Sequence, residues 1–159
     1  MIFRRATLKD LDPLCRLRSQ LVDDPEDRLT TEYAPYNEKR DKAWLQRLLR
    51  AHQRFVLIAE EKGIIYACSI VSIEKIPPKM QAYYTYRTKA LLVHLYVDKN
   101  HRHHGIGRAL TEYTLQYLMQ KGVEFMDLEC YMYNKKAAKL YNKIGFHDVF
   151  MTKRFILNK

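Results

Sequence analysis

The sequence lacks any apolar run long enough to cross a membrane. Its hydrophobic stretches fall well short of the roughly 18 residues that a membrane-spanning helix needs. Near the N-terminus, two arginines are followed by acidic residues instead of an uninterrupted apolar segment, which argues against a cleaved secretory signal. We therefore expect a soluble, cytoplasmic protein with no membrane partner.

Cysteine is also scarce. The three cysteines, Cys15, Cys68 and Cys130, lie far apart, contain no CxxC pair and leave an odd number. This pattern argues against both a disulfide framework and a zinc knuckle. We expect the three thiols to be reduced and mostly buried.

The chain also has no linker, internal repeat, low-complexity tract or long Lys/Arg tail. Its 159 residues, of which 47% are hydrophobic, fit one domain (1–159) with a real core. Acidic residues number 18 against 28 basic ones, which leaves a formal net charge of +10 and predicts attraction to polyanions. Because the basic residues are scattered, no nucleic-acid partner is expected.

The hydrophobic pattern alternates between helical and strand periodicity. The helix that follows residue 105 joins two neighbouring strands, which should therefore be parallel. The order of elements predicts a mixed α/β domain, with about four helices on the faces of a twisted, mostly antiparallel sheet of six to seven strands. Helices are expected from Thr7 to about 22 and at 38–52, 106–121 and 135–144, and strands at 2–6, 55–60, 64–73, 90–97 and 123–132, with a final hairpin at 146–157.

The stretch 91–107 carries the clearest functional pattern. An apolar run is followed by a short turn, Arg102, and two glycines, Gly105 and Gly107, that open onto a helical pattern. The first N–H groups of a helix have no intrahelical partner and attract anions. The stretch predicts a phosphate site.

Two motifs resemble those of the GNAT N-acetyltransferase superfamily. Arg102-x-x-Gly105-x-Gly107 is similar to the family's acetyl-CoA signature, [Arg/Gln]-x-x-Gly-x-[Gly/Ala]. The segment from Asn134 to Phe146 looks like the family's Asn…Ala…Leu-Tyr…Gly-Phe helix. The order of elements also matches, so the resemblance covers essentially the whole chain. It implies a single GNAT domain that uses acetyl-CoA as cosubstrate and needs no metal.

The resemblance also implies where acetyl-CoA binds. The pantetheine arm would pair with the backbone of Leu95, Tyr96 and Val97, and the N–H of Leu95, expected at a bulge, would bind the thioester carbonyl. Asn134 is a further candidate contact. The pyrophosphate would lie at the helix start, on Arg102, His103, His104, Gly105, Ile106, Gly107 and Arg108.

For catalysis, the resemblance implies that Tyr141 is the general acid for the departing thiolate and that Glu129 is the base for the amine proton. Leu91 is apolar where histone-type members carry a catalytic Glu. The acceptor is a primary amine, either a protein N-terminus or a small amine. Acceptor specificity is expected from the first two helices, the connection at 26–36 and the loop at 75–89.

Several residues have a second interpretation. Tyr141 can pack its helix on the sheet, Glu129 can simply face solvent, and Asn134 can cap a helix. A rival function is a basic nucleic-acid- or protein-binding module with CoA as a structural or vestigial ligand, and a homodimer is an open alternative. We favour a loop position for His101, His103 and His104 over a metal site. Cys130 is expected to be a small buried residue and not a carrier of a covalent acetyl group, and His94 is expected in the core or an interface and not in catalysis. Tyr83, Tyr84 and Tyr86 are expected to pack on the sheet or line the substrate cleft, in preference to stacking on bases.

Overall fold

The computed structural model describes residues 1–23, 34–153, 155 and 157. They belong to two compact units, Met1–Glu129 and Cys130–Lys159. Most of the connection expected at 26–36 lies outside the described residues. Among the described helices, none is both long and apolar enough to cross a membrane.

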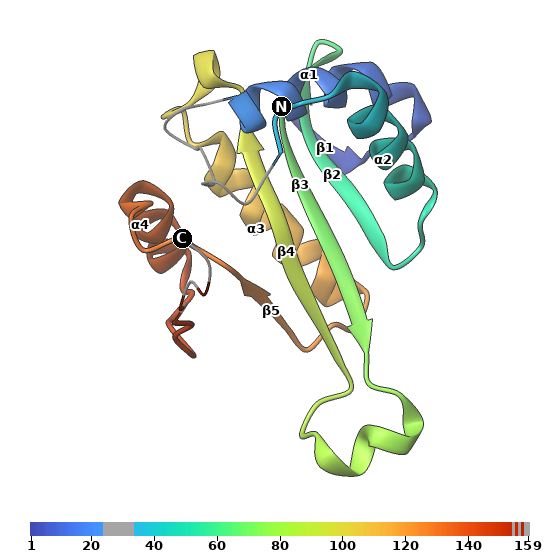
Figure 1. Ribbon diagram of the computed structural model, residues 1–159, viewed down its shortest axis with the longest axis vertical. Coiled ribbons are helices and arrows are strands. Elements are labelled where there is room, and N and C mark those ends of the chain that lie inside the picture. The colour runs from blue at the N-terminus through green and yellow to red at the C-terminus, as the bar shows by residue number, and fades with distance from the viewer. Residues whose placement is uncertain (24–33, 154, 156, 158–159) are drawn as a thin grey trace. The chain divides into compact units, whose positions relative to one another are not determined.

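The first unit is built on a five-stranded sheet whose strands lie in sequence order (Figure 1). The first four strands pair antiparallel, and the fourth and fifth pair parallel. The parallel pair confirms the predicted strand-helix-strand connection. The strands are β1 (Ile2–Arg5), β2 (Arg54–Glu61), β3 (Ile64–Lys75), β4 (Thr88–Val97) and β5 (Phe125–Leu128).

Five strands are fewer than the six to seven expected from the sequence. The last strand ends at Leu128 instead of 132, and the hairpin predicted at 146–157 is wrong, since none of its described residues is in a strand. A strand is stabilised by its ladder of hydrogen bonds and by burial of one face. Val149, Phe150 and Met151 have strand-like composition but are exposed.

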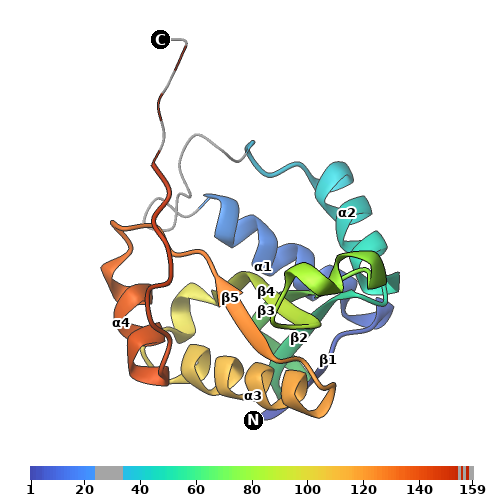
Figure 2. The ribbon, with the colours of Figure 1, turned by 90° about the horizontal axis from the view of Figure 1, so that it is seen from below.

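The described residues form four α-helices, in line with the four expected. α1 and α2 cover one face of the sheet and α3 the other (Figures 1 and 2). α4 belongs to the second unit. The helices are α1 (Leu11–Asp23), α2 (Glu38–Arg50), α3 (Ile106–Gln120) and α4 (Lys135–Ile144).

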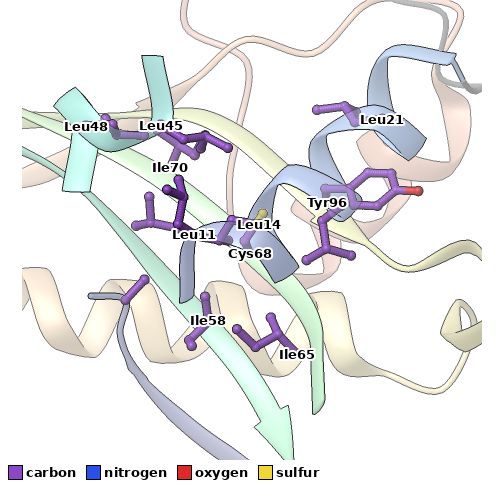
Figure 3. Close-up of a cluster of buried hydrophobic side chains, with 13 residues drawn as sticks. Leu11, Leu14, Leu21, Leu45, Leu48, Ile58, Ile65, Cys68, Ile70 and Tyr96 are labelled. Carbon is purple, nitrogen blue, oxygen red and sulfur yellow. The ribbon is translucent and has the colours of Figure 1, made fainter. Parts of the chain in front are cut away.

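Both faces of the sheet are buried because side chains alternate along each strand. On β3, Cys68 and Ile70 face α1 and α2, in the cluster that also holds Leu14 and other apolar residues of these helices (Figure 3). Ser69 points the other way, and its Oγ lies 3.0 Å from the Oγ1 of Thr114 on α3. Because both faces are buried, β2 and β3 have a continuous apolar run instead of alternating apolar and polar residues.

The start of α1 is preceded by one extra turn. The N–H of Thr7 donates to Oδ2 of Asp10 at 2.8 Å, as in a capping box. The turn that this pair starts is a 3₁₀ helix, Leu8–Asp10, which leads directly into α1.

Candidate functional site

The far end of β4 has an open edge. β5 pairs with β4 only from Lys89 to Leu92, whereas β4 continues to Val97. The register with β3 shifts between Ile70, opposite His94, and Val71, opposite Leu92, so Val93 is the extra residue of a bulge. The bulge was expected at Leu95. It lies earlier because the pairing with β3 decides its place, and two apolar strands carry no sequence signal for that pairing.

The backbone direction at this edge follows from two hydrogen bonds. The N–H of Asp98 donates to the carbonyl oxygen of Tyr66 on β3 at 2.7 Å. Successive residues of a strand turn their N–H groups to opposite edges, so Leu95 and Val97 face away from β3. In agreement, the carbonyl oxygen of Val97 accepts from Nε of Arg102 at 3.2 Å. The N–H of Leu95 therefore points to the edge that β5 leaves open.

The first N–H groups of α3 precede its ladder of hydrogen bonds. Its cap is Gly105, with φ of 78° and no side chain to cover the helix end. The first helical bond runs from the N–H of Ala109 to the carbonyl of Gly105, so the N–H groups of 106–108 precede the helical ladder. A Cβ on Gly105 would meet no atom outside its immediate neighbours within 4 Å. The helix dipole favours an anion there.

Arg102 and the neighbouring histidines hold the loop between β4 and α3. The guanidinium of Arg102 lies 5.3 Å from the ring centroid of Tyr96 on β4. The rings of His101 and Tyr66 meet at a tilt with centroids 4.4 Å apart, and Nδ1 of His104 lies 2.7 Å from the carbonyl oxygen of Arg102. His103 has φ of 67°, a conformation that glycine adopts more easily. Within the described part of the chain, no group of three His, Cys, Asp or Glu is arranged to hold a metal ion.

Asp98 anchors this loop to the rest of the unit, a role that the sequence analysis missed. Its buried carboxylate accepts from the guanidinium of Arg16 on α1, from the N–H of Asn100 at 3.0 Å, and from Nδ1 of His101 at 3.2 Å. Burial by itself would raise the pKa of Asp98, but these hydrogen bonds outweigh it and lower the pKa to about 2. An Asp directly after a strand and two residues before an Asn is the available sequence signal.

Replacing Asp98 by asparagine is expected to lower the free energy of unfolding by about 1–3 kcal/mol, because a buried amide cannot satisfy the donors that the carboxylate holds. Urea unfolding measures the loss. The matched control is Asp12→Asn, which removes a carboxylate that pairs with Lys42 but is 81% exposed and should cost less than about 1 kcal/mol. Equal losses in the two variants would contradict the anchoring role.

Glu129 lies where β5 leaves β4. The last pair of the ladder joins Leu92 to Leu128, so the next residues along the two strands are Val93, at the bulge, and Glu129. Glu129 is exposed and lies outside the strand. Glu129 thus ends the first unit at the beginning of the open edge. It is level with Val93, which lies two residues before Leu95 on β4.

The second unit carries the other motif. The side chain of Asn134 caps α4 by accepting from the N–H of Ala137 at 3.0 Å, as one of the two interpretations requires. Tyr141 is half-buried on α4, and its ring meets that of Phe146 edge to face, with centroids 5.7 Å apart. Gly145, with φ of 113°, ends the helix. The Asn and Gly of the motif therefore define the two ends of α4.

Cys130 and His94 have no catalytic features of their own. Burial raises the pKa of the Cys130 thiol, which disfavours the thiolate that an acetyl-cysteine would need. His94 lines an apolar pocket with α1 residues, among them Leu17 and Leu21. Burial first, then the charges of Arg18 and Arg54, lower the pKa of His94 to about 4. The imidazole is therefore neutral near pH 7.

Comparison with known proteins gives a consistent result. A model described as the acetyltransferase (GNAT) family matches residues 19–146. The chain is 31% identical over 67 residues to the ribosomal protein bS18-alanine N-acetyltransferase of Escherichia coli (strain K12). That match covers 42% of this chain and 45% of the relative, so the chain spans less than half the length of the curated relatives it matches.

Solved structures resemble the whole chain. The BH1408 protein of Bacillus halodurans, as a tetramutant, is 25% identical with a TM-score of 0.76, over 99% of this chain and 100% of that one. The aminoglycoside N-acetyltransferase AAC(6')-Iy in complex with CoA is 18% identical with a TM-score of 0.74, over 99% and 93% of the two chains. The ribosomal-protein-alanine N-acetyltransferase of Brucella melitensis biovar Abortus 2308 is 17% identical with a TM-score of 0.73, over 99% and 100%.

Proposed function

Because this chain belongs to the GNAT acetyltransferase family, we propose that it transfers the acetyl group of acetyl-CoA to a primary amine. The observation that carries the proposal is a path of outward backbone N–H groups from the open edge of β4, at Leu95 and Val97, to the start of α3 at 106–108. Acetyl-CoA has an amide-containing arm and a pyrophosphate. These are the two groups that such a strand edge and such a helix end bind.

The proposed reaction is a direct transfer. A neutral amine attacks the thioester carbon, a C–N bond forms, the C–S bond breaks, and the sulfur leaves as a thiolate. The N–H of Leu95 stabilises the oxyanion that forms on the carbonyl oxygen. Glu129 accepts the proton that the amine loses, and Tyr141, in the position of the family's general acid, donates a proton to the sulfur.

The acceptor that we propose is the N-terminal amine of a polypeptide. The curated relative with 31% identity is named for N-acetylation of an alanine of ribosomal protein bS18. The aminoglycoside enzymes are similar at lower identity, which supports a shared fold only. The net charge of +10 also disfavours a strongly cationic small acceptor.

Acetyl-CoA is expected to raise the melting temperature. At about 100 times its dissociation constant, a ligand that binds only the folded state adds about 2.7 kcal/mol. For a chain of this length, that corresponds to about 5–10 °C. ADP, which has the pyrophosphate but no pantetheine arm, is the control and should shift the midpoint less.

The absence of a shift with acetyl-CoA would overturn the proposal and favour the rival function as a binding module. If the shift occurs, release of CoA from acetyl-CoA is measured with a panel of acceptors: peptides that begin with alanine, an aminoglycoside and spermidine. Turnover with the peptides alone supports the N-terminal acceptor. Turnover with the aminoglycoside alone would contradict the N-terminal amine as acceptor but would still support the proposed acetyl transfer.

A further inference from the structure

The connection between β3 and β4 is an ordered loop that has no part in the proposed reaction. β3 and β4 run past the other strands, and their connection holds a 3₁₀ helix, Pro78–Tyr83 (Figure 1). We call residues 76–87 the hairpin tip. Its ends are joined by the N–H of Ile76, which donates to the carbonyl oxygen of Arg87 at 2.9 Å.

The hairpin tip presents aromatic rings to solvent. Tyr83 is 79% exposed, so it does not pack on the sheet, which was one of the two positions expected from the sequence. Tyr84 meets Tyr86 at 5.4 Å, and Tyr86 meets Phe125 of β5 edge to face at 4.7 Å. Tyr86 and Phe125 thus connect the tip to the sheet, while the ring of Tyr83 stands outward.

Hydrogen bonds between side chains and the backbone hold these rings in place. The guanidinium of Arg87 donates to the carbonyl oxygens of Tyr84 and Tyr86 at 3.1 and 3.2 Å. The carboxylate of Glu124 accepts from the N–H groups of Arg87 and Thr88 at 2.7 and 3.0 Å. Because the tip is ordered before a partner arrives, binding loses little conformational entropy.

The charge of the hairpin tip has one sign. Residues 76–87 include two basic side chains, Lys79 and Arg87, and no acidic one, and Lys75 directly precedes them. In a two-fold dimer through this surface, each patch would face its own copy and the like charges would repel. Met80 is the single large aliphatic side chain that is exposed among the tip residues, too little to anchor the tip in a lipid bilayer. The complementary partner is a polyanion that also has flat rings.

We propose that the hairpin tip binds single-stranded RNA. The ring of Tyr83 stacks on a base, and Lys75 and Lys79 neutralise phosphates of the same strand, a combination that suits unpaired strands. The three exposed or half-exposed rings are tyrosines, whose hydroxyls can bond the 2′-OH that distinguishes RNA from DNA. Such contact would hold the enzyme near an RNA-bound acceptor without occupying the acetyl-CoA site.

The test is the fluorescence anisotropy of a short labelled oligo(U) as protein is added at about 50 mM salt. Tyr83→Ala is expected to weaken binding about 5- to 150-fold. Tyr83→Phe should retain binding because it keeps the aromatic face, and Tyr83→Leu should weaken it like alanine. Lys79→Ala should reduce the slope of log affinity against log salt by about 0.7. Lys9→Ala, at an exposed lysine near α1, is the matched control and should leave the slope unchanged.

Three results would overturn the proposal: no salt-dependent binding of oligo(U), wild-type affinity in Tyr83→Leu, or oligo(dT) binding as tight as oligo(U). Binding of phosphatidylserine vesicles that Tyr83→Ala abolishes, with oligo(U) unaffected, would assign the tip to a membrane instead. Every tip variant is also melted with acetyl-CoA. An unchanged shift separates loss of RNA binding from failure of the proposed transferase activity.

Discussion

Replacing Tyr141 by phenylalanine is expected to lower the turnover number about 100-fold or more, because the phenol is the proposed proton donor to the CoA thiolate. Only the hydroxyl is lost. The ring keeps its edge-to-face contact with Phe146 at 5.7 Å, and the backbone carbonyl of Tyr141 still accepts from the N–H groups of Gly145 and Phe146. The end of α4 should therefore stay folded, and the affinity for acetyl-CoA should change little.

Two measurements separate the acid role from a packing role. CoA release at saturating substrate gives the turnover number, and the melting shift with acetyl-CoA reports binding. Tyr133→Phe, at an exposed tyrosine just before α4, is the matched control and should keep wild-type turnover. A Tyr141→Phe enzyme with wild-type turnover would remove Tyr141 from the acid role and leave only its contact with Phe146.

Acidification from pH 6.5 to 4 is expected to lower the free energy of unfolding by about 3 kcal/mol through His94 alone. This imidazole lies in the apolar pocket between α1 and the sheet. Burial, followed by the charges of Arg18 and Arg54, lowers its pKa from 6.5 to about 4. Between these two values the imidazole is mostly protonated in the unfolded chain and mostly neutral in the folded protein.

The sign follows from this difference in bound protons. The contribution of His94 is fully present above pH 6.5, decreases as the pH falls, and levels off below about 4. The buried carboxylates Asp10 and Asp98, whose pKa values hydrogen bonds lower to about 2, lose their contributions only below 3.8. The two intervals are therefore separate in a titration of stability.

Urea unfolding at a series of pH values tests this expectation. His94→Gln removes the titrating group and should flatten the decline between pH 6.5 and 4. His52→Gln, at an exposed histidine after α2, should retain the decline because His94 remains. An unchanged decline in His94→Gln would show that other groups cause it.

The order of the elements could be predicted because each one has its own periodicity. Leu11, Leu14, Leu17 and Leu21 recur at helical spacing and are all buried along α1. Gly105 and Gly145, placed at a helix start and a helix end by their neighbours in sequence, adopt positive φ at those positions. The candidate loop between β4 and α3 was visible for the same reason.

Features that depend on pairing between distant residues could not be predicted. The bulge at Val93 exists only relative to β3, and the hairpin expected at 146–157 had the composition of strands without a ladder. The carboxylate of Asp98 accepts a hydrogen bond from Arg16, which lies 82 positions earlier, so no local pattern could indicate this pair. The guanidinium of Arg102 contacts Val97 and Tyr96, and no local pattern in the sequence indicates these contacts.

The sequence by itself determined the family, the order of helices and strands, and the helix start at Gly105, because these depend on residues close together along the chain. Only the tertiary structure decided that β5 leaves β4 at Leu92, that Leu95 and Val97 turn their N–H groups to the open edge, and that Tyr83 stands in solvent. The physical reason is that edges and exposure belong to the packed sheet. No single strand carries that information.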